Sequence, residues 1–172
     1  MGLLNSEPCT WLNISKGFLE NKKKNIHSHG YEGLLIGIER KLDTFEEKEI
    51  SKIVLTMADT DPSAKGQKVK IQFTEDAWFA NGFFGRIRAV DIAKPFTVGV
   101  SQSDKNEKVS FCWIKQSGST IKRDDKYPQP EKVTVGKQDI MDWTGVTECN
   151  TSIIEEIQHK IGANASGGDL PF

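Results

Sequence analysis

The stretch Lys68-Val69-Lys70-Ile71-Gln72-Phe73 decides the fold class of this chain. Apolar and polar side chains alternate here without a break, so the three apolar ones share one face of an extended strand and the three polar ones share the other. A turn-forming segment, residues 59–66, precedes this strand, and residues 50–57 before the turn show a second strand pattern. Together the two patterns predict a β-hairpin with one buried face.

The segments on either side of this hairpin extend the pattern. Residues 34–40 predict a further strand, and residues 76–92 predict a helix because Phe79, Phe83 and Ile87 recur at helical spacing. The other expected elements are strands at 11–15, 96–101, 109–115 and 133–135 and a C-terminal helix from about 151 to 161. Three strands, a helix and a two-stranded hairpin are the element order of the OB-fold, a five-stranded, partly open barrel with its helix between strands 3 and 4. The sequence therefore predicts a mainly β, OB-fold-like barrel followed by a C-terminal helix and a flexible tail.

The composition is that of an ordinary globular protein, but the charge is unevenly distributed. The 172 residues are 37% hydrophobic and 27% charged, with a net charge of −1, and this length suits one domain with an appendage. Residues 61–137 carry a net charge of +5 and residues 138–172 a net charge of −5. The positive segment could attract a polyanion with which the negative end competes, although ordinary variation in surface charge is an equal alternative. Neither a long apolar run nor a secretory signal is found, so we expect a cytoplasmic protein.

The last four residues, Asp169-Leu170-Pro171-Phe172, resemble the C-terminal tip of bacterial single-stranded DNA-binding proteins. In that family an OB-fold is followed by a flexible tail whose tip docks onto replication and repair proteins. A terminal phenylalanine can fill an apolar pocket while its carboxylate meets a basic residue, and the proline limits the entropy lost on docking. The body is similar to the compact OB-fold proteins with which phages coat single strands, through Trp11-Leu12-Asn13-Ile14, Asp91-Ile92-Ala93-Lys94-Pro95 and Phe111-Cys112-Trp113.

This resemblance implies a sequence-nonspecific single-stranded DNA-binding protein that acts in DNA replication, recombination or repair. It would work in the bacterial cytoplasm, or in the host cytoplasm if phage-encoded. Residues 1–148 would form the binding domain, residues 149–161 the C-terminal helix, and residues 162–172 a flexible linker with the docking tip. The expected partners are single-stranded DNA and, through the tip, a helicase, primase, polymerase, nuclease or recombinase. Association into a homo-oligomer would bring several binding domains together.

Single-strand binding needs cations for the phosphates and aromatic rings on which bases stack. The ring candidates are Trp11, Phe111, Trp113 and Tyr127, and the candidates for phosphate contacts are Lys68, Lys70, Arg86, Arg88, Lys115, Lys122 and Arg123. Phe111 and Trp113 share a strand face, so burial of both in the core is an equal alternative. Lys68 and Lys70 could likewise belong to a solvated outer face that binds nothing.

Residues typical of catalytic or metal sites are sparse. The chain has no glycine-rich loop followed by Lys and Ser or Thr, so nucleotide hydrolysis of the P-loop kind is not indicated. His27 and His29 could share a metal, but no third ligand stands at the usual spacing, and Asp59 and Asp61 belong to a turn. Cys112 alternates into a strand with no neighbouring base. We expect a non-enzyme without metal or cofactor; the alternative to DNA binding is an OB-like adaptor or structural protein that docks partners through its tip.

Overall fold

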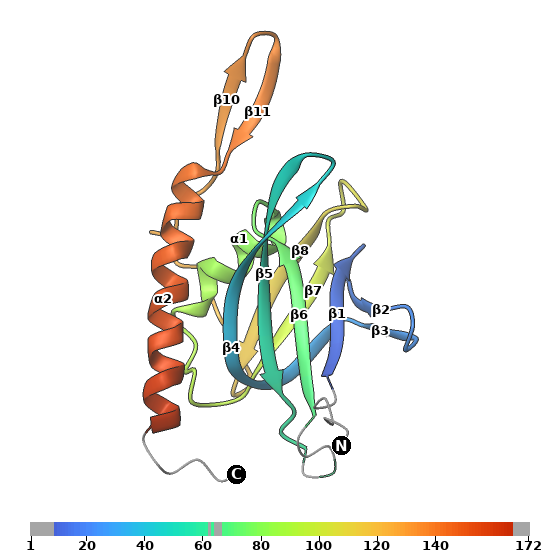
Figure 1. The fold of residues 1–172 in the computed structure, drawn as a ribbon, viewed down its shortest axis with the longest axis vertical. Coiled ribbons are helices and arrows are strands. Elements are labelled where there is room, and N and C mark those ends of the chain that lie inside the picture. Colours follow the sequence, from blue (N-terminus) through green and yellow to red (C-terminus); the bar gives the residue numbers. More distant parts are fainter. Residues whose placement is uncertain (1–8, 62, 64–66, 167–172) are drawn as a thin grey trace, which may run out of the picture.

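The computed structural model describes residues 9–61, 63 and 67–166 (Figure 1). Its strands are β1 (Cys9–Ser15), β2 (Phe18–Asn21), β3 (Ile26–Ser28), β4 (Gly30–Phe45), β5 (Lys48–Ala58), β6 (Lys68–Thr74), β7 (Phe96–Gln102), β8 (Ser110–Gln116), β9 (Ser119–Thr120), β10 (Glu131–Val135) and β11 (Gln138–Asp142). Its helices are α1 (Trp78–Ile87) and α2 (Thr144–Ser166). The described chain is mainly β, as predicted. The five predicted core strands are β4 to β8, and α1 lies between the third and fourth of them.

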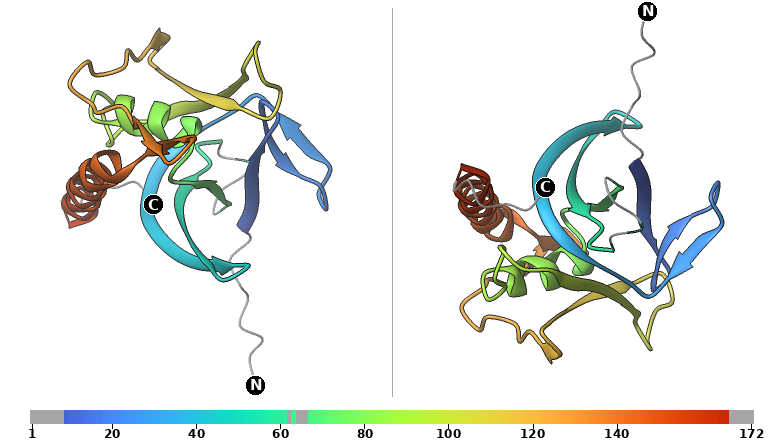
Figure 2. Two further views of the ribbon diagram at one scale, coloured as in Figure 1. Left: turned by 90° about the horizontal axis from the view of Figure 1, so that it is seen from above. Right: turned by 90° about the horizontal axis from the view of Figure 1, so that it is seen from below.

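The strands from β1 to β9 form one sheet in the order β3-β2-β1-β6-β5-β4-β7-β8-β9. Neighbouring strands run antiparallel except β1 and β6, which are parallel. β4 joins the two halves of the sheet, because residues 30–33 pair with β7 and residues 34–45 pair with β5. The sheet curls strongly (Figure 2), but β3 and β9 remain the ends of the strand order among the described residues. No closed barrel forms there, and the OB-like barrel stays a prediction.

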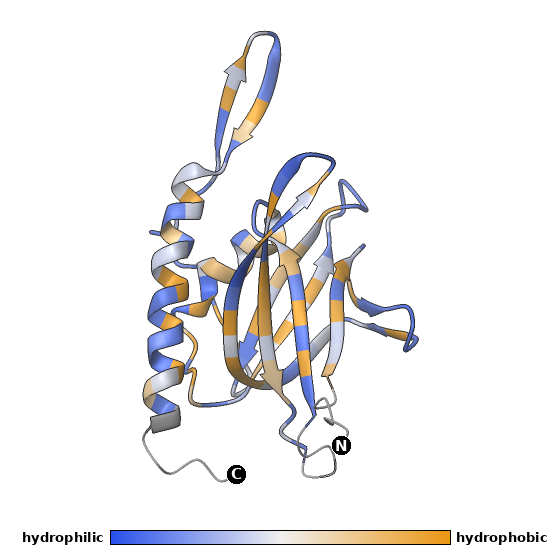
Figure 3. Cartoon of the chain, in the orientation of Figure 1, coloured by the Kyte–Doolittle hydropathy of each residue, from blue (hydrophilic) through white to orange (hydrophobic). Residues whose placement is uncertain are grey.

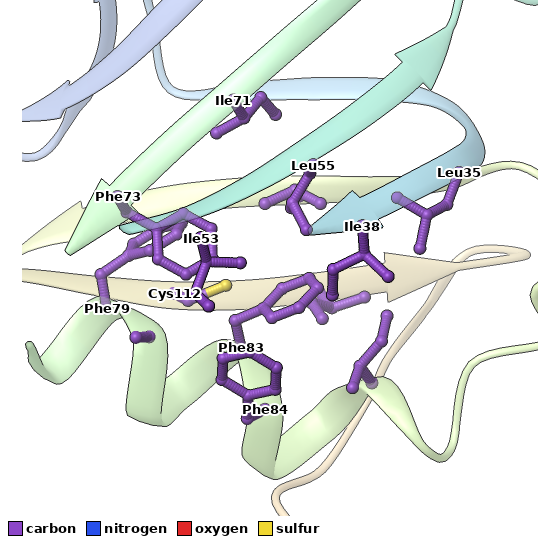
Figure 4. Packing of buried hydrophobic residues seen from close by; sticks show 14 of the residues in the cluster. Leu35, Ile38, Ile53, Leu55, Ile71, Phe73, Phe79, Phe83, Phe84 and Cys112 are labelled. Carbon is purple, nitrogen blue, oxygen red and sulfur yellow. The ribbon is translucent and has the colours of Figure 1, made fainter. Parts of the chain in front are cut away.

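A single hydrophobic core lies between the curled sheet and α1 (Figure 4). The alternation that predicted β5 and β6 places Ile53, Leu55 and Ile71 on the inner face, in the same core as Phe79 and Phe83 from α1. Hydrophobic and hydrophilic residues alternate along β6 in Figure 3. The polar residues of the same strands consequently point to the outer face of the sheet.

Helix α1 is shorter than residues 76–92 but has the predicted inward face, with Phe79, Phe83 and Ile87 buried. Its glycines, which are unfavourable for an isolated helix, have a packing reason. A Cβ atom at Gly82 would lie 3.2 Å from the Cβ atom and from the backbone oxygen of Cys112. Glycine therefore allows α1 to approach β8 closely.

Helix α2 is longer than predicted at both ends. It begins at Thr144, where the Asp142 carboxylate accepts hydrogen bonds from the Thr144 backbone N–H at 3.0 Å and from its hydroxyl at 2.7 Å. Asn150, which directly precedes the predicted start of the helix, lies inside it and is fully buried. The helix continues to Ser166 and thus replaces the first part of the predicted linker at 162–172. The docking tip at 169–172 lies outside the described residues.

The β10–β11 hairpin was predicted only in part, as a short strand at 133–135. It extends beyond the body of the molecule in Figure 1, and every one of its strand residues is exposed. β11 was missed because its sequence, Gln138-Asp139-Ile140-Met141-Asp142, does not alternate between apolar and polar residues. Neither α1 nor α2 combines the length and the apolar character needed to cross a membrane.

Candidate functional site

The outer face of β1, β6, β5 and β4 carries the strongest candidate site, which we call the Trp11 face. Leu12 and Ile71 point into the core, so their neighbours on β1 and β6 must point outward. The face includes Trp11, Asn13, Lys41, Lys52, Lys68, Lys70 and Gln72, and the strand registers place Glu39, Val54 and Thr56 on it as well. It therefore gathers one aromatic ring and four lysines from segments that are distant in the sequence.

The Trp11 ring lies between two lysine ammonium groups. Trp11 pairs with Lys70 in the parallel β1–β6 ladder, and the Lys70 Nζ atom lies 5.0 Å from the ring centroid. The Lys41 Nζ atom lies 5.5 Å from the same centroid. β6 and β5 separate β1 from β4 in the sheet order. Lys41 reaches the ring because the β4–β5 hairpin curls toward β1 (Figure 2). The ring is still 38% exposed.

The charge on the Trp11 face is predominantly positive. Lys41 forms an ion pair with Glu39 at 3.5 Å, and Lys52 forms one with Asp43 at 3.4 Å. Both pairs are exposed, and pairs of this kind contribute at most about 1 kcal/mol. A polyanion could therefore replace the carboxylates at little cost. The sequence did not indicate Lys41 and Lys52 as site residues. Only the register of β4 and β5 places them on this face, and local sequence patterns do not give that register.

Phe111, Trp113 and Lys115 form a second group, on the outer face of β8. The inward positions of this strand belong to Cys112 and Ile114, which are buried. Phe111 is 41% exposed, and Lys115 Nζ lies 5.2 Å from the centroid of the Trp113 ring. The alternative of burial in the core is therefore wrong for this pair of rings. β8 is separated from β6 by β5, β4 and β7 in the sheet order.

Arg123 and Tyr127 form a third, internal group. Tyr127 is only 6% exposed, and its hydroxyl donates a hydrogen bond to Asn150 Oδ1 at 2.5 Å. Arg123 donates to Asn81 Oδ1 at 2.6 Å, and its guanidinium carbon lies 5.0 Å from the Tyr127 ring centroid. Burial raises the pKa of the Tyr127 phenol and lowers the pKa of Arg123. Tyr127 consequently has no open ring face for a base, and the stacking role predicted for it is wrong.

The remaining basic candidates lie away from the Trp11 face. Arg86 donates through Nη1 to the Gly82 backbone oxygen at 2.9 Å. Arg88 forms an ion pair with Glu156 of α2 at 3.1 Å. Lys122 is exposed beside a cavity between α1 and α2. The structure thus divides the predicted groove among separate places: Trp11, Lys68 and Lys70 lie together on the Trp11 face, whereas Phe111, Trp113 and Lys115 lie together on β8.

The residues considered for metal or nucleophile chemistry have structural surroundings. The His27 and His29 rings lie 3.6 Å and 4.5 Å from the ring centroid of Phe18. Burial raises the pKa of the Cys112 thiol, which disfavours the reactive thiolate.

Among known proteins, the chain matches no family model, no curated protein and no solved structure. Its function must therefore be inferred from the geometry described above.

Replacing Tyr127 with phenylalanine is expected to lower the free energy of unfolding by about 1–3 kcal/mol, since the fully buried Asn150 would lose its hydrogen-bond donor. Tyr31→Phe is a matched control, because its hydroxyl is buried without a hydrogen-bond partner among the described residues; its removal should leave stability unchanged or slightly higher. Urea unfolding of both variants checks this, and equal losses would contradict the assignment.

Proposed function

We propose that this protein binds single-stranded DNA without sequence preference across the Trp11 face and carries out no catalysis. The observation that carries the proposal is the exposed Trp11 ring between Lys70 and Lys41 on a sheet face turned away from the core. Bases of a single strand expose their ring faces and can stack on an indole, whereas those of a duplex are already stacked. A base that stacks on Trp11 would displace one ammonium group, which could then contact a phosphate.

We further propose that β4 to β8 are the five strands of an OB-like barrel. In support, β6, β5, β4, β7 and β8 are consecutive in the sheet, and α1 lies between β6 and β7 in the chain. β1 lies parallel to β6 at the edge where a barrel would otherwise have to close. In OB-folds the outer face of strands 2 and 3 binds oligonucleotides. Here these strands correspond to β5 and β6, which contribute Lys52, Lys68 and Lys70 to the Trp11 face.

The resemblance of Asp169-Leu170-Pro171-Phe172 to the tip of bacterial single-stranded DNA-binding proteins supports a role in replication, recombination or repair, with partner proteins recruited through this tip. Work on DNA inside the cell would place the protein in the cytoplasm. Self-association would add binding faces along one strand. These proposals depend on the sequence resemblance and on the Trp11 face together.

Titration of the full chain with fluorescent oligo(dT) over a series of salt concentrations tests the function. We expect binding that weakens as salt rises, with a log–log slope of about −0.7 for each phosphate neutralised, and much weaker binding to duplex of the same length. Binding that is absent at low salt would contradict DNA binding and favour the adaptor interpretation. Equal affinity for duplex would contradict the role of stacking.

A further inference from the structure

A cavity of about 370 Å³ opens beside the Trp11 face, between the ends of β1 and β6, the start of α1 and the start of β8. Its apolar lining includes Phe73 and Phe79, whose ring centroids lie 4.9 Å apart (Figure 4). Lys52, Lys108 and Trp78 also line it. This volume falls in the range of pockets that hold small organic ligands, and the lining combines apolar side chains with polar and charged ones.

The cavity is continuous with the Trp11 face. Asn13 and Gln72 pair with each other across β1 and β6, two residues beyond Trp11 and Lys70, and both line the cavity. Their side chains are joined by a hydrogen bond of 2.8 Å from Gln72 Nε2 to Asn13 Oδ1. The next outward position on β6 is Thr74, which pairs with Lys52, and both of these residues also line the cavity.

The geometry of β-strands sets the length of this path. Each step of two residues along a strand covers about 6.6 Å. Gln72 is one such step from Lys70 and Thr74 is two, so the lining of the cavity begins about 7 Å from Lys70 along β6 and extends to about 13 Å. A single strand of DNA that lies along β1 and β6 from Trp11 would therefore reach the cavity after a short distance.

Trp78 offers a second aromatic surface on this path. Its side chain is 38% exposed and lines the cavity. Its ring meets that of Trp143 edge to face, with the centroids 5.5 Å apart. Trp143 thereby fixes the orientation of the Trp78 ring from outside the cavity. Within the described part of the chain Lys52 forms an ion pair with Asp43, and Lys108 lies on the exposed loop before β8.

We propose that this cavity takes up one unpaired base of a bound DNA strand, which stacks on Trp78 while Lys52 and Lys108 contact the adjacent phosphates. The proposal rests on the proposed function, because the strand must first lie along the Trp11 face. It adds a specific site to that function: the strand has two stacking positions, Trp11 and Trp78, with the Asn13–Gln72 pair between them.

The first test uses Lys108→Gln with Lys105→Gln as its matched control, since both lysines lie on the loop between β7 and β8 but only Lys108 lines the cavity. Binding is measured with oligo(dT) of about 4 to 16 nucleotides, the range of site sizes for one OB-fold. Lys108→Gln should reduce the salt slope by about 0.7 for the longer oligonucleotides. Lys105→Gln should match the wild type, and equal slopes for all three proteins would overturn the role of Lys108.

The second test uses Trp78→Ala and the conservative variant Trp78→Tyr. Loss of one stacking contact should weaken binding of oligonucleotides that span both sites by about 5- to 150-fold, and tyrosine should restore most of the loss. If Trp78→Ala fails to fold, photocrosslinking of the wild type to oligo(dT) with one 5-iodouracil replaces it. A crosslink to Trp78 supports the site, and crosslinks that avoid Trp78 at every oligonucleotide position overturn it.

The two proposals fail in different ways. A wild-type protein that binds no oligonucleotide contradicts the proposed function and the cavity site with it. A wild-type protein that binds, and whose affinity falls for Trp11→Ala but not for Trp78→Ala, overturns the cavity site alone.

Discussion

Replacement of Arg40 by methionine is expected to lower the free energy of unfolding by about 3–5 kcal/mol. The Arg40 guanidinium donates from Nε to Glu75 Oε2 at 2.8 Å and from Nη2 to Glu75 Oε1 at 2.6 Å. Glu75 is only 2% exposed, and its other side-chain hydrogen bond comes from the Ser51 hydroxyl at 3.0 Å. Methionine would leave this buried carboxylate without a counter-charge, which costs far more than the loss of an exposed ion pair.

The same guanidinium also attaches α2 to the sheet. Its Nη1 atom donates to Thr151 Oγ1 at 2.7 Å, and Nη2 donates to the Thr147 backbone oxygen at 3.2 Å. Further along the helix, Gln158 Nε2 donates to the Ile38 backbone oxygen at 2.8 Å. Arg40→Met should therefore speed amide hydrogen exchange in α2 more than in β5 and β6, whose strand hydrogen bonds do not depend on Arg40.

Urea unfolding measures the expected loss, and Arg88→Met is the matched control. Arg88 also connects to α2, through Glu156, but both side chains of that pair are about 40% exposed, so its loss should cost less than about 1 kcal/mol. Arg40→Met combined with Glu75→Leu should recover part of the stability, because no buried charge remains. An Arg40→Met variant no less stable than Arg88→Met would contradict the role given to the buried pair.

Trp11→Ala is expected to weaken the binding of oligo(dT) by about 5- to 150-fold, the effect of removing one base-stacking surface. The protein should remain folded, because the ring lies outside the core and its contacts with Lys70 and Lys41 are exposed. Trp11→Phe should retain part of the affinity, since a smaller ring still stacks. Fluorescence titration of the three proteins at one fixed salt concentration gives the comparison.

Phe111→Ala separates the Trp11 face from the outer face of β8. Phe111 is as exposed as Trp11 but lies on a strand that is not next to β1 or β6. We expect this variant to bind with nearly wild-type affinity. A larger loss for Phe111→Ala than for Trp11→Ala would move the binding site to β8, and unchanged affinity in Trp11→Ala would remove the Trp11 face from the proposed function.

The sequence alone correctly indicated the elements whose local pattern is unambiguous. In β6 the apolar and polar side chains alternate strictly, and in α1 Phe79, Phe83 and Ile87 recur at helical spacing, so these inward residues could be assigned without tertiary information. β8 was different because both of its faces are apolar. The structure places Cys112 and Ile114 inside, since Cys112 fits against Gly82 of α1, whereas Gly99 on β7 leaves room outside for the Trp113 ring.

The candidate site depended on contacts that no local pattern encodes. Trp11 and Lys70 are neighbours because β1 and β6 pair in parallel, and Lys41 joins them because the β4–β5 hairpin curves over the face. The polar loop around Tyr127 indicated an exposed ring. The structure instead buries this ring, and its hydroxyl donates a hydrogen bond to Asn150 of α2. The sequence by itself determined which side chains of each strand and helix share a face, because backbone geometry fixes that periodicity. The tertiary structure alone decided which faces meet, because pairing and burial depend on the fit between distant segments.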